Sequence, residues 1–469
     1  MMLNSNRSAV ALGVPAIALA IITLATLINL KYGLACLGLI VVMLFLFASP
    51  SRGSVAGAVF LLVWAPDAPT VFHVHGAPVS PRWVVLGLVF LMCASWILRG
   101  RIRPRLTFSR LWLVMTIIVV VGGILDHRTH GILDFLGFAA IPYVLGCTLG
   151  DNAERIVGVI RGLVAGACVC AAEAVIEFVR GKPFFPALSH KGIFLRAGNL
   201  RAYAGWSHPL ALGMFLCLAA FLVIDRARLR SLWITIGAVM LIVAGIFATQ
   251  ERSPLIGLAA GAFTFVLLQP KLRYKIRATA GVAVAGLVVL LFPGSEGASF
   301  RNYLTASTTV ANQAGADVTG RLTLLKLGLH AVLTKPFYGW GYGVTDTTGS
   351  VPGLATIMTS GTHTYTDIAN WPLSVAIQTG LIGFAVMMII VLANFLRLIR
   401  LRNQDRVLPI VPAAAGLAAA FIASFGSEAR SSTMVFLFVI GAFSTGCAFK
   451  RSDVAEVRIV AETGAEPAR

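Results

Sequence analysis

Charged residues are scarce in this sequence, and acidic residues are the scarcest. Only 12% of the 469 residues are charged, and 38 Lys and Arg outnumber 19 Asp and Glu, which gives a net charge of +19. A soluble protein of this length would need far more charged surface to stay in solution. The composition therefore argues against a soluble enzyme.

Cysteine is also sparse, and its arrangement argues against two kinds of site. The seven cysteines lie within apolar runs, and no Cys-x-x-Cys pair occurs. Neither a disulfide framework nor a thiolate metal site is indicated. His73 and His75 lack an evident third ligand, so we expect no metal centre.

Long hydrophobic runs dominate what remains. Hydrophobic residues make up 58% of the chain, and a helix needs about 20 of them to cross a hydrocarbon core. We therefore predict an all-α fold, a polytopic transmembrane helical bundle of about 12 to 14 spans, with those between 33 and 65 as candidate half-spans. The runs lie near residues 10–30, 33–48, 53–65, 83–98, 111–125, 131–149, 156–179, 206–224, 231–248, 253–268, 278–293, 371–396, 409–425 and 431–449.

The positive charge gathers in alternate loops and so predicts an orientation. By the positive-inside rule these loops face the cytoplasm, and both termini are expected there with them. The same pattern favours the lipid bilayer over nucleic acid as the partner of the basic residues. The basic positions are Arg7, residues 99–110, 226–230, 271–277 and 397–406, and Lys450 with Arg451.

Two loops on the opposite face are long, at about residues 180–205 and 294–370. Long ordered loops are commonly functional. We expect one membrane domain over residues 1–450, with 294–370 as its large periplasmic loop, and a disordered cytoplasmic tail at 451–469.

The larger loop contains a predicted amphipathic helix from Arg321 to Leu333. Apolar residues recur there at helical spacing, and Pro336 would end the helix. Such a helix suits a membrane surface. The expected apolar positions are Leu322, Leu325, Leu329 and Val332, and the expected polar ones are Lys326 and His330.

Four arginines lie on the face where the topology rule predicts few positive charges: Arg196, Arg201, Arg252 and Arg321. Guanidinium matches phosphate bidentately and stays charged. Snorkelling to lipid headgroups would explain any one of them. The group as a whole favours a phosphate site.

Other titratable groups leave alternatives open. His363, near the end of the long loop, could take a proton from a hydroxyl or could simply be solvated. His208 begins a span and is expected to be structural. Glu173 and Glu177 share a helix face, where they could relay protons in a transporter, or Glu177 could pair with Arg180.

Four segments resemble segments of the O-antigen ligase and polymerase superfamily of bacterial membrane glycosyltransferases, and they occur along the chain in the same order as in that family. Glu251 stands where the family usually has Ser. The resembling region spans 194–449, whereas the first 180 residues resemble the family only as hydrophobic spans. The segments are 201–213 (RAYAGWSHPLALG), 249–253 (TQERS), Gly320-Arg321 leading through Pro336 to 339–343 (GWGYG), and 370–383 from Asn370 through Gly380.

This resemblance implies a GT-C-like fold and an inverting, metal-independent glycosyltransferase that needs no cofactor. The donor would be a glycan on undecaprenyl diphosphate, and the acceptor another glycan or a lipid. Other polysaccharide-assembly proteins are candidate partners. The enzyme would lie in the bacterial inner membrane with its site in the periplasm. The residues implied to bind the diphosphate or substrate are Arg252, Arg321, Arg201, Arg196 and Asn370.

The candidate base departs from the family pattern. Counting back from Gly380, the family histidine would fall near Ala369, whereas the nearest histidine here is His363. We take His363 as the candidate base. The departure favours a polymerase over a strict ligase.

Two functions from other classes remain as alternatives. A secondary transporter or lipid-linked glycan flippase should show repeated halves and midplane charges. A membrane scaffold without catalysis would leave the four arginines unexplained. The arginines and the single very long loop favour the transferase.

Overall fold

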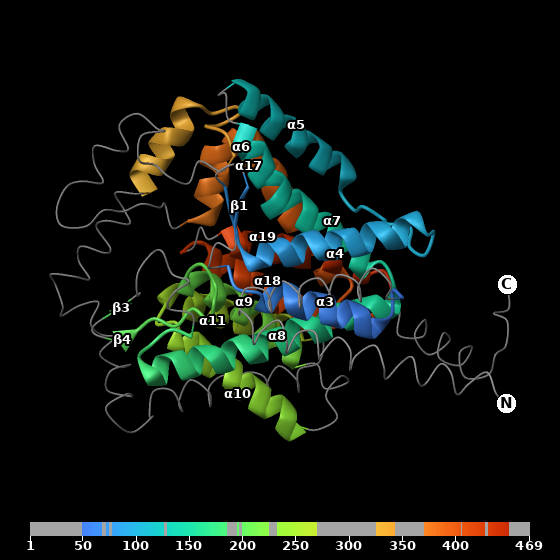
Figure 1. The fold of residues 1–469 in the computed structure, drawn as a ribbon, viewed down its shortest axis with the longest axis vertical. Helices are drawn as coiled ribbons and strands as arrows, with labels where there is room; N and C mark the ends of the chain where they lie inside the picture. Colours follow the sequence, from blue (N-terminus) through green and yellow to red (C-terminus); the bar gives the residue numbers. More distant parts are fainter. Residues whose placement is uncertain are drawn as a thin grey trace, which may run out of the picture.

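The computed structural model of the chain is predominantly helical over the residues that it describes (Figure 1). The predicted all-α membrane fold is confirmed. The apolar runs at 10–30, 33–48 and 278–293 and the tail at 451–469 lie outside the described residues. The described residues are 49–67, 72–74, 77–125, 129–184, 195–196, 199–224, 232–269, 325–342, 370–404, 406–426 and 430–449.

The helices follow the apolar runs closely. Four, namely α4, residues 131–150, α8 and α17, are long and apolar enough to cross a membrane, and the other apolar helices have 10–17 residues. The helices are α3 (Arg52–Trp64), α4 (Pro81–Leu98), α5 (Ser109–Leu125), α6 (Thr129–Phe135), η1 (Leu136–Ala140), α7 (Ile141–Gly150), α8 (Ala153–Arg180), α9 (Pro209–Val223), α10 (Leu232–Ala248), α11 (Arg252–Leu268), Leu325–Thr334, α17 (Trp371–Arg400), α18 (Ile410–Ser424) and α19 (Arg430–Gly446).

Two short antiparallel hairpins, which the sequence did not predict, lie in the connections. Strands β1 (Phe72–Val74) and β2 (Ala77–Val79) join α3 to α4. Strands β3 (Leu195–Arg196) and β4 (Asn199–Leu200) precede α9.

Local signals fix where the helices begin, end and bend. The Asn152 side chain accepts the N–H of Glu154 at 2.8 Å and so caps α8, while Gly181 ends it in the left-handed conformation (φ 62°). The π-helical turn η1 lies immediately before Pro142, which lacks an N–H and would crowd the carbonyl one turn back. This bulge keeps α6 and α7 in one continuous path.

Small residues let the helices approach one another closely. Helix α11 packs along α18, with Gly257 so close to the carbonyl of Ala419 that a Cβ there would lie 2.4 Å from it. Helix α7 packs on α19 in the same way at Gly146, and α3 on α8 at Gly162. Such contacts replace the hydrophobic driving force that lipid does not provide between helices.

Two of the predicted basic loops, 99–110 and 397–406, meet at one end of the bundle. Arg105 reaches Asp151 at 3.9 Å, Arg397 donates to the carbonyl of Ser444 at 2.7 Å, and Arg406 donates to that of Ala448 at 2.6 Å. Burial raises the pKa of the Asp151 carboxyl, although the arginines around it act in the other direction. We call this the basic end. The opposite end, which carries Asp67, Glu177, Arg201 and Glu251, is called the Arg201 end.

The predicted amphipathic helix is present as Leu325–Thr334, drawn in amber at the upper left of Figure 1, with its first predicted turn outside the described residues. Its buried residues are Gly328, Ala331 and Val332, which pack on α17. Leu325 and Leu329 are 46% and 55% exposed. Of the predicted apolar positions, Val332 therefore faces the protein, whereas Leu325 and Leu329 face its surroundings. The location of this helix at a membrane surface stays a prediction.

Candidate functional site

The Arg201 end brings together two segments that lie far apart in the sequence. Arg201, which precedes α9, forms an ion pair with Glu251, which precedes α11. The Glu251 side chain is 2% exposed and that of Arg201 is 20% exposed. A backbone hydrogen bond of 3.0 Å from Ala202 to the carbonyl of Ala248 joins the same two segments. The pair is therefore part of a packed junction.

Arg252 is the first residue of α11 and follows Glu251 directly. The hydroxyl of Thr249 accepts the Glu251 N–H at 3.4 Å and so orders this turn. The partial positive charge of the α11 N-terminus adds to that of Arg252. Arg201, Glu251 and Arg252 together sum to one net positive charge beside a helix start, which favours an anionic ligand.

The backbone is strained beside this pair. Among the described residues, three that are not glycine have positive φ, and two of them are Ala204 (φ 43°) and Gln250 (φ 53°). Each lies within three residues of Arg201 or Glu251. Such conformations persist only where the surrounding structure enforces them, and they gather at functional sites.

The other predicted site residues are described in part or not at all. Arg196 lies in β3, paired with Asn199, and its side chain is outside the described part. Arg321 and His363 are outside the described residues. Asn370 precedes α17, and its side-chain oxygen accepts the N–H of Leu373 at 3.0 Å. The structure thus brings Arg201 close to Arg252 and leaves the convergence of the other site residues a prediction.

Helix α17 is broken at Gly380, which has φ 68° and ψ −177°. The turn after helix 325–334 binds into this break through two backbone hydrogen bonds. Trp340 N–H donates to the carbonyl of Ile377 at 2.8 Å, and Leu381 N–H donates to that of Pro336 at 2.6 Å. Two segments that resemble the family, 339–343 and 370–383, are therefore interlocked here.

We call this contact between residues 336–341 and α17 the clasp, and the described chain ends beyond it at Tyr342 and resumes at Asn370. On one side, the ring of Tyr342 packs edge-on against Phe135 at 5.2 Å between centroids. On the other, Asn370 caps the first half of α17. His363 lies between Tyr342 and Asn370 in the sequence, outside the described residues.

Sequence reasoning missed three features of the Arg201 end. Glu251 was noted only as a departure from the family's Ser, which was the available signal. Arg82, which directly precedes the predicted run 83–98 and was not singled out, is buried beside Asp67. Glu177 accepts backbone hydrogen bonds from Phe184, Tyr203 and Ala204, a role that neither alternative for it foresaw.

His208 has the structural role that was expected. Its Nδ1 accepts the N–H of Leu210 at 3.1 Å, and it caps α9 ahead of Pro209. Within the described parts of the chain, no three His, Cys, Asp or Glu side chains gather as metal ligands.

Comparison with known families gives a match over one third of the chain. Residues 236–388 match the family model of O-antigen ligase, a range that includes Glu251, Arg252, Arg321, His363 and Gly380. Comparison with curated proteins gives no match. This match confirms, over residues 236–388, the resemblance to the O-antigen ligase superfamily that was seen in the sequence.

Proposed function

We propose that this protein transfers a glycan from an undecaprenyl-diphosphate-linked donor to an acceptor hydroxyl at the periplasmic face of the inner membrane. The match to O-antigen ligase over residues 236–388 supports a role in glycan ligation or polymerisation in general. The observation that carries the finer proposal is the junction of Arg201, Glu251 and Arg252 at the end of the bundle opposite the basic loops.

The chemistry fits a diphosphate leaving group. Negative charge develops on the diphosphate as the bond to the anomeric carbon breaks, and fixed guanidinium groups can stabilise it. In the proposal Arg252 and Arg321 hold the diphosphate, with Arg201, Arg196 and Asn370 completing the substrate site. Since arginines supply the positive charge, we propose a metal-independent reaction, whose rate should persist in EDTA.

His363 is the proposed base that takes the proton of the acceptor hydroxyl. Its offset from the position of the family histidine favours a polymerase, in which the acceptor is another glycan, over a ligase with a lipid acceptor. In both cases the acceptor attacks the anomeric carbon from the face opposite the diphosphate, which inverts the sugar's configuration.

The proposed orientation places the basic end and both termini in the cytoplasm and residues 294–370 in the periplasm. A single cysteine at Ser307 tests it, in a variant without reactive native cysteines. It should react with an impermeant maleimide in cells whose outer membrane alone has been opened. Labelling only after the inner membrane is lysed would contradict the orientation and the mechanism with it.

The function is tested in cells that depend on this protein for their surface polysaccharide. Arg252→Ala should abolish the polymer and make the lipid-linked glycan accumulate on the periplasmic side. Arg180→Ala, which removes an exposed arginine from the same end, is the matched control and should make normal polymer. Accumulation on the cytoplasmic side would instead favour the flippase alternative.

A further inference from the structure

The segment 201–208, which we call the 201–208 loop, is held by two acidic residues from other parts of the chain. One is Glu177 near the end of α8, and the other is Asp67 between α3 and α4. Both precede the region that matches O-antigen ligase, residues 236–388. The loop begins with Arg201, so whatever fixes the loop also fixes the position of that guanidinium.

Glu177 is completely buried, and its carboxylate accepts hydrogen bonds from three backbone N–H groups. Its Oε2 accepts the N–H groups of Tyr203 and Ala204, both at 2.9 Å, and its Oε1 accepts the N–H of Phe184 at 2.9 Å. A carboxylate has enough acceptor sites for three such donors, whereas an amide in its place would turn an N–H₂ group toward them. The loop's positive φ at Ala204 is thus enforced from α8.

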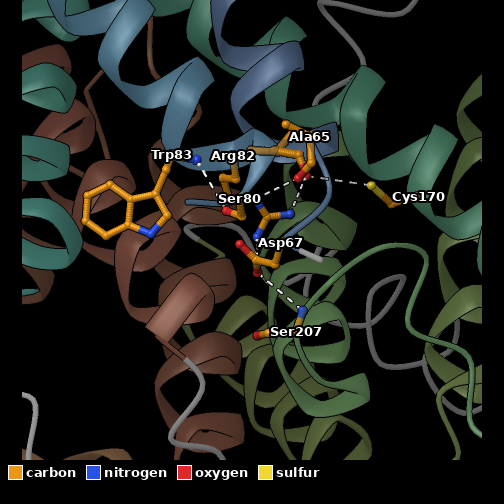
Figure 2. A network of polar contacts seen from close by, with 8 residues as sticks. Ala65, Asp67, Ser80, Arg82, Trp83, Cys170 and Ser207 are labelled. Carbon is orange, nitrogen blue, oxygen red and sulfur yellow. Dashed lines mark hydrogen bonds and ion pairs between the residues drawn. The ribbon is translucent and has the colours of Figure 1, made fainter. Parts of the chain in front are cut away.

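Asp67 holds the other half of the loop. Its Oδ2 accepts the N–H of Ser207 at 3.3 Å, and its own N–H donates to the carbonyl of Gly205 at 2.7 Å. Arg82 fixes this carboxylate through a 2.9 Å ion pair, and Figure 2 shows Asp67 between Arg82 and Ser207. The loop therefore donates one hydrogen bond to Asp67 and accepts another from it.

Arg82 is itself locked in place. It is 1% exposed and donates to the carbonyls of Ala65 at 2.9 Å and Val63 at 3.3 Å. Its guanidinium carbon lies 4.0 Å from the ring centroid of Trp206, which stacks on Phe215 in the middle of α9. A buried cation with this many partners leaves Asp67 little freedom to move.

We propose that Glu177 and Asp67 are positioning residues, which hold the 201–208 loop so that Arg201 stands beside Glu251 and Arg252 and contacts the donor. The proposal rests on the proposed function for its link to the donor. It adds that the N-terminal part of the chain completes the site. If the two acids contributed only to general stability, their loss would not act through Arg201.

The order of the loop can be measured without any activity assay. Ser207 is partly buried, so a single cysteine there should react slowly with an impermeant maleimide in the full-length protein. Glu177→Gln and Asp67→Asn should each raise that rate about tenfold or more. The matched control is Glu173→Gln, one turn away on α8, whose carboxylate instead accepts the indole N–H of Trp64.

Equal labelling rates in all three variants would overturn the proposal. Both Glu177→Gln and Asp67→Asn are measured, so that if one variant fails to accumulate in cells, the other still tests the proposal. For each variant, migration of the protein as a single species in detergent serves as the criterion that it is folded.

Kinetics test the link to the donor. With a lipid-linked glycan donor, Glu177→Gln should raise KM about tenfold and change kcat less than about threefold, because lost binding without lost chemistry affects KM. In combination with Arg201→Ala it should cause no further loss, since residues acting through one contact are not additive. A fall in kcat alone, or full additivity, would refute the positioning role. Full activity of Arg201→Ala would instead refute the diphosphate role of Arg201, while the labelling rates would still report on the loop.

Discussion

Glu251, directly before α11, forms an ion pair with Arg201, the first residue of the 201–208 loop, and the acidic partner is almost completely buried. The pair joins the α9 entry to the α11 entry and neutralises one of the arginines that would otherwise repel Arg252. Its carboxylate explains how two arginines can lie close together at this end of the bundle. The ion pair also gives a role to Glu251, which the family resemblance had marked only as a departure from the usual Ser.

Removal of the Glu251 charge should destabilise the protein. Glu251→Gln should lower the free energy of unfolding by about 1–3 kcal/mol, because it leaves a partly buried guanidinium with a weaker partner. Thermal unfolding in detergent measures this. Glu154→Gln alters an exposed acid in the first turn of α8 and should cost less than about 0.5 kcal/mol. Equal melting temperatures of the two variants would show that the ion pair contributes nothing.

The clasp at α17 should tolerate no side chain at its glycines. Gly380 has a conformation that is essentially restricted to glycine, and a Cβ there would lie 2.5 Å from the carbonyl group of Phe337. Gly380→Ala should therefore cost about 1–3 kcal/mol from backbone strain and more from the clash.

Gly237→Ala provides the control for that substitution. Gly237 lies within α10, and no atom would lie within 4 Å of an added Cβ. The alanine should be neutral or slightly stabilising. Comparable melting temperatures for Gly380→Ala and the wild-type protein would mean that the clasp is looser than the structure indicates.

Physical reasoning from the sequence located the described spans because lipid imposes a strict rule. Any chain that crosses a bilayer must be apolar over a known length and must satisfy its own backbone. The run predicted at 156–179 thus became α8, and that at 371–396 became α17.

Contacts between residues far apart in the sequence could not be predicted in this way, because no comparable rule governs them. Glu177 gave a signal as an intramembrane acid, but nothing in the sequence says that Tyr203 and Ala204 would present their N–H groups to it. Similarly, Arg82 lies in a span whose pattern is apolar, and its burial depends on Asp67 and Trp206. The glycines of the clasp were noted as a motif, whereas their interlocking required the structure.

His363→Ala should reduce the rate of glycan transfer by about 100- to 10,000-fold, the usual contribution of a general base. Binding of the donor should survive, because the arginines remain. The wild-type rate should also fall as the pH is lowered through the pKa of the imidazole, since the protonated ring cannot accept the hydroxyl proton.

His330→Ala is the matched control for the base, because His330 lies on the exposed polar side of helix 325–334. Its activity and pH profile should equal those of the wild type. A His363→Ala enzyme with the wild-type rate would remove histidine from the mechanism and leave the arginine site untouched.

Binding of undecaprenyl diphosphate to the purified protein in lipid nanodiscs tests the central claim most directly, that the arginines at the Arg201 end form a diphosphate site. We predict that Arg252→Ala raises the Kd at least about tenfold, a loss of about 1.4 kcal/mol. Arg252→Lys should recover only part of this, since an ammonium lacks the planar fork, and Arg180→Ala should bind as the wild type does. An unchanged Kd for Arg252→Ala would contradict the account.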